Sequence, residues 1–87
     1  MEITYKELLN LINHEHEVFK TIEDELGDVD DHGDSTYYLV FYNSPTDEHW
    51  MVDYIREKEW GIMKEETYDC ERVYPHIVQK TVWRSTP

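Results

Sequence analysis

The chain has 87 residues and a formal net charge of −12, with 20 acidic side chains against 8 lysines and arginines. This length predicts one small domain over residues 1–87, and an aromatic content of 14% is too high for a disordered acidic tail. The charge argues against direct binding to nucleic acid or to an anionic membrane, because both would repel it. Cys70 is the only cysteine, which excludes an internal disulfide and a cysteine-based zinc site. We find no signal peptide or membrane span and expect a cytoplasmic protein, located in the host cytoplasm if a phage encodes it.

The first predicted element is a helix that begins after Thr4. Thr4 and Glu7 form a Thr-x-x-Glu capping box, in which each side chain can bond a free backbone amide of the first turn. Ile3 and Leu8 have the spacing of a hydrophobic staple around this cap. Apolar residues then continue at helical spacing to Ile12.

Residues 18–26 carry a second helical pattern. Their apolar side chains recur at positions 18, 19, 22 and 26, and Gly27 is suited to the left-handed position that follows a helix. We predict either two helices or one long, bent helix that ends near Leu26. A strand over Val18–Ile22 is the alternative.

From residue 35 the pattern changes to that of β-strands. Residues 35–42 are rich in β-branched and aromatic side chains, and residues 49–56 alternate between two faces. A turn over 43–47 joins them, and a polar turn at 57–59 leads to a short third strand over 60–64. These runs predict an antiparallel meander, with Tyr38, Val40, Trp50, Val52 and Trp60 in the core.

The end of the chain adds one more predicted strand. Residues 67–72 are expected to form a polar connection, and a strand is expected from His76 to Trp83 with Pro75 at its entrance. The predicted fold class is therefore α+β, with one or two N-terminal helices followed by a three- to four-stranded antiparallel β-meander.

The acidic stretch of residues 15–34 is the candidate functional surface. Its net charge is −8 of the chain's −12, with Lys20 as its one base. Like charges at this density cost stability through self-repulsion, which favours a cationic partner. The predicted partner-binding residues are Glu15, Glu17, Glu23, Asp24, Glu25, Asp28, Asp30, Asp31 and Asp34.

This surface suggests mimicry of DNA. B-DNA carries one phosphate charge per about 1.7 Å of its axis, and carboxylates on a helix with a rise of about 1.5 Å per residue, continued in an acidic loop, approximate that density. A DNA-binding groove lined with Lys and Arg would then bind the protein in place of its substrate. The simpler interpretation is an acidic domain whose charge serves only solubility.

Two motifs suggest metal ions, and each departs from the established pattern. Residues 28–34 place acids at the first and third positions and glycine at the sixth position of an EF-hand loop, but the fifth is His32 and the twelfth is Leu39 instead of a glutamate. His14 and His16 are two residues apart, which does not place them on one helix face. We therefore predict no metal site and no cofactor, and keep a calcium-responsive domain as an alternative.

The sequence offers little for catalysis. It contains no glycine-rich phosphate loop and no nucleophile-elbow pattern. Asp69 and Glu71 flank Cys70 and are expected to raise the pKa of its thiol, which makes it a poor nucleophile. We expect a protein without enzymatic activity.

Residues 42–51, YNSPTDEHWM, followed by Trp60 in KEWGIM, are similar to part of the phage-encoded uracil-DNA glycosylase inhibitor family. The matching positions are Tyr42, Thr46-Asp47-Glu48 and Met51, and size and acidity also agree. The resemblance implies an inhibitor that lays an acidic edge strand, with a Glu-Ser-Ile run, into the DNA groove of the enzyme. The nearest stretch here, Thr21-Ile22-Glu23, differs from that run and is expected to be helical, so no inhibitory residue is carried over.

We therefore predict a non-enzymatic inhibitor, a phage-type DNA mimic that blocks the nucleic-acid-binding site of a DNA-processing or host-defence enzyme. Candidate targets are uracil-DNA glycosylase, a Cas nuclease (an anti-CRISPR function) and a restriction enzyme. A nuclease immunity or antitoxin-type protein would use the same charges. It is the alternative, beside a calcium-responsive or other small acidic interaction domain.

Overall fold

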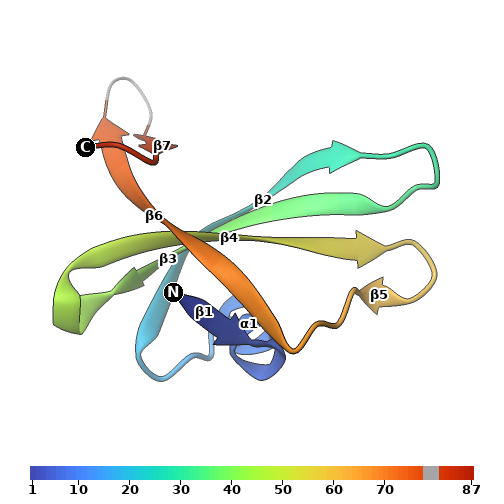
Figure 1. The fold of residues 1–87 in the computed structure, drawn as a ribbon, viewed down its shortest axis with the longest axis horizontal. Helices are drawn as coiled ribbons and strands as arrows, with labels where there is room; N and C mark the ends of the chain where they lie inside the picture. The colour runs from blue at the N-terminus through green and yellow to red at the C-terminus, as the bar shows by residue number, and fades with distance from the viewer. Residues whose placement is uncertain (78–80) are drawn as a thin grey trace.

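The computed structural model describes residues 1–77 and 81–87, and β-strands dominate this part of the chain (Figure 1). In chain order the elements are β1 (Glu2–Thr4), α1 (Tyr5–Ile12), β2 (Phe19–Val29), β3 (Ser35–Asn43), the 3₁₀ turn η1 (Ser44–Thr46), β4 (Glu48–Glu57), β5 (Gly61–Ile62), β6 (Thr67–Ile77) and β7 (Thr81–Arg84). All described strand pairs are antiparallel.

The strands lie in the order β1-β6-β4-β3-β2, so β1 and β2 form the two edges of this path. The central strand β4 pairs with β3 along its length. On its other side β4 pairs first with β6 and, at its end, with β5. β6 and β5 therefore pair with different parts of β4. β6 crosses the front of the molecule, while the β2–β3 and β4–β5 hairpins extend together to one side (Figure 1).

The core lies between α1 and one face of the sheet. Leu8 and Leu11 of the helix are fully buried, and they belong to one cluster with strand residues Ile3, Leu39, Phe41, Val52, Tyr54, Tyr68 and Cys70. The predicted capping box is confirmed: Thr4 Oγ1 accepts a hydrogen bond from the Glu7 amide (3.2 Å), and the Glu7 carboxylate accepts one from the Thr4 amide (3.0 Å). The helix therefore begins where the sequence predicts it.

The predicted fold class is wrong. Instead of one or two helices followed by a three- to four-stranded meander, the described residues form one eight-residue helix and seven antiparallel strands. The two strands predicted at residues 35–42 and 49–56 are confirmed, because β3 and β4 cover them. The errors lie before and after this hairpin.

The largest error concerns residues 18–26, which are predicted to be helical, whereas residues 19–26 form most of the edge strand β2 and thus agree better with the alternative of a strand over Val18–Ile22. Two bulges explain the misleading pattern, because the pairing of β2 with β3 shifts at Ile22 and again at Gly27. Each bulge adds an unpaired residue and resets the alternation of the strand, so its apolar residues fall three and four positions apart, as on a helix. Gly27 does not end a helix; a Cβ atom there would overlap the Tyr38 ring.

Three other predictions also fail. Residues 67–72, predicted as a connection, begin strand β6. The strand predicted from His76 to Trp83 is instead the antiparallel pair of β6 and β7, with residues 78–80 outside the described part. Trp60, predicted in the core, lies exposed in the β4–β5 turn, and Tyr38 is also exposed. Val40 and Val52 are buried as predicted, and Trp50 is half-buried.

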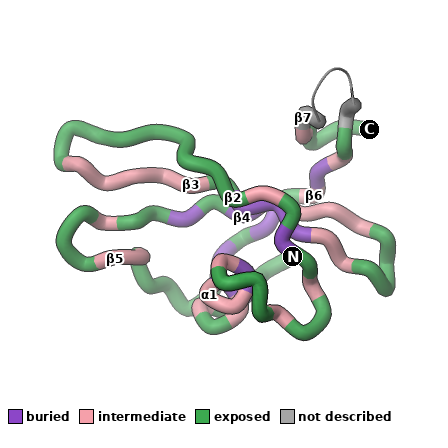
Figure 2. Tube along the Cα trace, turned by 180° about the vertical axis from the view of Figure 1, so that it is seen from behind, coloured by how far each residue is buried: buried purple, intermediate pink, exposed green. Residues whose placement is uncertain are grey.

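The two hairpins extend beyond the helix. We call this part, residues 23–38 and 53–62, the distal arm; most of its backbone belongs to exposed or half-buried residues (Figure 2). Leu26 pairs with Tyr37 and Val29 pairs with Ser35, yet Leu26 and Val29 are 54% and 58% exposed. Apart from Tyr54, which belongs to the core, the distal arm therefore presents both of its faces to solvent.

Candidate partner-binding surface

The pairing of β2 with β3 decides which acidic side chains share a face. Residues that pair across antiparallel strands lie on the same side of a sheet. Glu23 pairs with Val40, and Glu25 pairs with Tyr38, on the side that points away from α1. The bulge at Gly27 then brings Asp28 onto this side as well, although it lies three positions after Glu25.

Acidic residues from three other strands lie on the same side. Met51 pairs with both Val40 and Glu71, which places Glu71 on the side of Glu23. Asp53 pairs with Tyr38, as Glu25 does. Asp69 lies two residues before Glu71 and pairs with Glu2 of β1. We call this surface the open face; its acidic residues are Glu2, Glu23, Glu25, Asp28, Asp53, Asp69 and Glu71.

The open face has little positive charge to balance these acids. Among the described strand residues, Lys20 is the one base that the pairing assigns to this face, where it lies opposite Tyr42. Arg72 is bound to Glu48 (2.7 Å), and Arg56 lies over the Tyr37 ring on the helix side (5.5 Å to the ring centroid). Six of the seven open-face acids are exposed and Glu23 is half-buried, so the charge is available to a partner.

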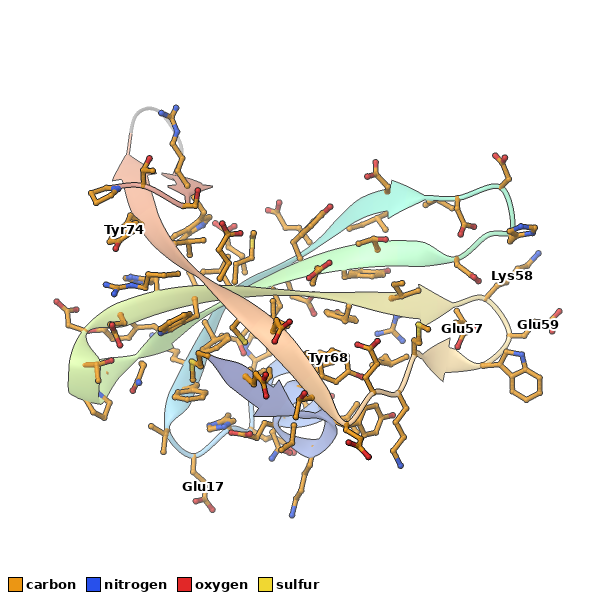
Figure 3. All side chains as sticks on the ribbon, viewed as in Figure 1. Glu17, Glu57, Lys58, Glu59, Tyr68 and Tyr74 are labelled. Carbon is orange, nitrogen blue, oxygen red and sulfur yellow. The ribbon has the colours of Figure 1, made fainter. Side chains whose placement is uncertain are left out.

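A cavity lies where β4 and β6 separate, and residues from both faces of the sheet line it. β4 pairs with β6 from His49 to Val52, and the cavity, of about 270 Å³, lies beside the next residues of β4. Asp53, Glu65 and Asp69 line it together with Tyr68, which is labelled at the centre of Figure 3. Three carboxylates around one cavity would accommodate a cationic side chain of a partner.

Asp24, another predicted contact residue, lies on the opposite side of β2 from the open face. It pairs with Leu39, and its carboxylate accepts a hydrogen bond from the Tyr54 hydroxyl (2.7 Å). Burial, together with this hydrogen bond, raises the pKa of the Tyr54 phenol well above its usual value. The hydrogen bond between Asp24 and Tyr54 therefore connects the acidic strand β2 to the core.

The predicted residues Asp30, Asp31 and Asp34 lie at the tip of the β2–β3 hairpin. Asp30 Oδ1 accepts hydrogen bonds from the amides of His32 (2.9 Å) and Asp34 (3.0 Å), which close the loop. The Asp34 carboxylate accepts one from the Lys58 amide in the β4–β5 turn (3.2 Å), which joins the two hairpin tips. Asp31 is exposed. Across residues 1–77 and 81–87, no group of three histidine, cysteine or acidic side chains is arranged to hold a metal ion.

Glu15 and Glu17 lie apart from the other predicted residues, in the loop between α1 and β2. Figure 3 shows Glu17 far from Glu57, Lys58 and Glu59 at the hairpin tips. The nine predicted residues therefore lie in four places. Glu23, Glu25 and Asp28 are on the open face, Asp24 is on the opposite side of β2, Asp30, Asp31 and Asp34 are at the hairpin tip, and Glu15 and Glu17 are in this loop.

His16 holds the loop between α1 and β2 in place. Its Nδ1 accepts hydrogen bonds from the amides of Val18 (3.1 Å) and Phe19 (3.0 Å), so the ring proton lies on Nε2, which donates to Glu7 (3.2 Å). The ring also stacks on Phe19, with centroids 4.4 Å apart. Burial tends to raise the pKa of Glu7, but the hydrogen bonds from Thr4 and His16 outweigh it and lower that pKa. Both ring nitrogens of His16 are therefore engaged within the protein.

Cys70 is buried, and burial raises the pKa of its thiol to about 12. Its neighbour Asp69 raises this pKa further by a smaller amount. The thiol thus stays protonated near neutral pH, a state in which it does not act as a nucleophile.

No protein-family model matches the chain, and neither a curated protein nor a solved structure matches it. Among the described residues, no helix has the length and apolar character needed to cross a membrane.

Proposed function

We propose that the protein is a non-enzymatic inhibitor that occupies the nucleic-acid-binding site of a DNA-processing or host-defence enzyme as a DNA mimic. The observation that carries this proposal is the open face. Carboxylates from β1, β2, β4 and β6 gather there, with Lys20 as the one described base that the strand pairing places among them. A surface of this kind attracts a groove lined with lysine and arginine and repels nucleic acid.

The dimensions of a β-sheet suit this role. Alternate residues of a strand are about 6.8 Å apart, and neighbouring strands are about 4.8 Å apart. The open face therefore presents its carboxylates as a two-dimensional array with spacings of several ångströms. B-DNA presents a dense array of phosphates in a similar way, with one charge per about 1.7 Å of its axis.

The charges of β2 are held in position before a partner binds. The strand is paired with β3 from Phe19 to Val29, and the Asp24–Tyr54 hydrogen bond ties it to the core. A surface that is already ordered loses little conformational freedom on binding, which favours affinity. Long-range attraction between opposite charges then makes association fast and sensitive to salt.

The position of β2 also agrees with what the resemblance to uracil-DNA glycosylase inhibitors implies. That family places an acidic edge strand in the DNA groove of its target, and β2 is an edge strand with Glu23, Glu25 and Asp28 on its open face. The Glu-Ser-Ile run of the family is missing here. The proposal therefore names the class of target, an enzyme that binds DNA, and includes Cas nucleases and restriction enzymes.

Two charge-reversal variants test the proposal. The open-face variant combines Glu23→Lys, Glu25→Lys and Asp28→Lys. The control variant combines Glu15→Lys, Glu17→Lys and Glu66→Lys, which changes the net charge equally at exposed residues outside the open face. Each protein serves as bait in a bacterial lysate, bound proteins are eluted with duplex DNA, and the eluate is identified by mass spectrometry.

We expect the unmodified protein and the control variant to retain the same DNA-binding enzyme and to release it to duplex DNA, whereas the open-face variant loses it. Retention should also fall steeply as salt is raised. If the open-face variant keeps the enzyme, or if DNA does not displace it, the interface lies elsewhere and DNA mimicry is wrong. Circular dichroism of each variant checks that the fold is intact.

A further inference from the structure

Trp60 is the most exposed of the large hydrophobic side chains in the described residues, with 81% of its surface open to solvent. A tryptophan usually buries most of its large apolar ring. Exposed aromatic side chains on ordered elements are frequent anchors of protein–protein interfaces. The chemical groups around Trp60 then determine which kind of partner side chain it can bind.

The turn that carries Trp60 is fixed to the neighbouring hairpin. The Lys58 amide donates a hydrogen bond to the Asp34 carboxylate (3.2 Å). The Lys58 side chain also packs closely against Gly33, because a Cβ atom on Gly33 would lie 3.0 Å from Cδ of Lys58. Gly61, directly after Trp60, has a φ of +79°, a left-handed conformation that glycine adopts readily at the end of this turn. The two tips therefore form one surface (Figure 3).

A hollow of about 210 Å³ lies between the two tips, beside Trp60. The residues that line it are His32, Asp34, Glu57, Lys58, Glu59 and Trp60. Three carboxylates against one ammonium group make the hollow negative, and the indole supplies an aromatic wall. A guanidinium group matches both features, because it is planar, stacks on aromatic faces and bonds carboxylates with two parallel hydrogen bonds.

We infer that Trp60 and this hollow form an anchor for an arginine side chain of the partner, which stacks on the indole and is bonded by the surrounding carboxylates. The inference rests on the proposed function, since the arginine belongs to the same basic DNA-binding surface, and it extends the contact from the open face to the hairpin tips. Charge complementarity favours this occupant. A second copy of the chain, at −12, or a nucleic acid would bring negative charge to a negative surface.

Titration of the 87-residue protein with hexa-arginine and hexa-lysine peptides at low salt tests the anchor. The peptides carry the same charge, so a purely electrostatic surface binds them equally. The indole N–H signals of the three tryptophans in ¹⁵N-labelled protein report where the peptide binds, and Trp60→Phe assigns the signal of Trp60. Binding constants are measured for the unmodified protein, for Trp60→Ala and for the control Val18→Ala, whose side chain is 51% exposed in the loop before β2.

We expect hexa-arginine to shift the Trp60 signal more than the other two and to bind about two- to fivefold more tightly than hexa-lysine, the range of an exposed cation–π contact. Trp60→Ala should remove this preference and retain the fold, and Val18→Ala should keep the preference. Equal affinities, or a preference that survives in Trp60→Ala, would overturn the anchor. The anchor would also be overturned if the Trp60 signal moved with protein concentration alone, which would indicate a second copy of the chain, or on addition of a single-stranded oligonucleotide, which would indicate nucleic acid. Equal affinities, or a preference that survives in Trp60→Ala, leave the proposed function standing, because that function is tested separately by whether the open-face variant keeps its enzyme and whether DNA releases that enzyme.

Discussion

The hydroxyl of Tyr54, buried in the core, donates a hydrogen bond of 2.7 Å to the carboxylate of Asp24 on the acidic edge strand. The bond connects β4 to β2 across the intervening strand β3. Tyr37 of β3 stacks on the Tyr54 ring, with centroids 5.3 Å apart. The strand proposed to contact a partner is thus stabilised from the face opposite the proposed contact.

Asp24→Ala is expected to lower the free energy of unfolding by about 1–3 kcal/mol, because the buried Tyr54 hydroxyl loses its acceptor. Glu25→Ala on the open face should change stability little or raise it, since the substitution relieves repulsion between acids. Urea denaturation of the two variants measures the difference. Equal losses of stability would show that the hydrogen bond contributes nothing specific.

A second substitution separates the hydrogen bond from other effects of Asp24. In a Tyr54→Phe background the hydroxyl is absent, so Asp24→Ala should cost less than it does in the unmodified protein. The coupling free energy between the two substitutions measures the bond. A cost that is unchanged by Tyr54→Phe would assign the effect of Asp24 to something other than this contact.

Stability should fall with rising pH in the alkaline range. Burial raises the pKa of the Cys70 thiol to about 12, and burial with the Asp24 hydrogen bond raises the pKa of the Tyr54 phenol. In the unfolded chain these groups lose their protons near pH 8.5 and 10, so above about pH 8.5 the folded protein binds more protons than the unfolded chain. The free energy of unfolding must then decrease as pH rises through this range.

Urea denaturation at a series of pH values from 7 to 11 checks this expectation. Cys70→Ala and Tyr54→Phe should each reduce the slope, since each removes one of the groups whose pKa is raised. A stability that stays constant up to pH 11 would contradict it. A thiol reagent should also fail to label Cys70 in the native protein at pH 8 and should label it after unfolding.

His16→Ala is expected to lower the free energy of unfolding by about 1–3 kcal/mol, because the amides of Val18 and Phe19 lose their shared acceptor and Glu7 loses a donor. Glu17→Ala, at an exposed position one residue later, is the matched control and should have little effect. Thermal unfolding followed by circular dichroism measures both. If the two variants melt together, the ring does not stabilise the loop.

Local interactions explain why parts of the fold were predictable. The capping box joins residues three positions apart, so Thr4 and Glu7 specify the start of α1 without help from the rest of the chain. The β3–β4 hairpin is also local, because its alternating pattern and the turn at 43–47 lie within one continuous stretch. The β3–β4 hairpin is therefore predictable without knowing which other strands pair with it.

The structure of residues 18–29 depends on contacts that the local pattern does not contain. A helix and a twice-bulged strand share the same apolar spacing, and pairing with β3 makes the strand the stable choice. Trp60 was misplaced for a related reason. A short strand was expected to carry its ring into the core, whereas the chain turns at residues 58–60 and β5 begins only at Gly61.

The net charge of −12 and the acidic run at residues 15–34 were present in the sequence alone, and they predicted an acidic protein with a cationic partner. Which carboxylates act together was decided by the tertiary structure. Strand order and register bring Glu2, Asp53, Asp69 and Glu71 onto the same face as Glu23, Glu25 and Asp28 of β2, while Glu15 and Glu17 lie elsewhere. The physical reason is that each strand offers alternate residues to each face, so the composition of a face depends on pairing between strands far apart in the chain.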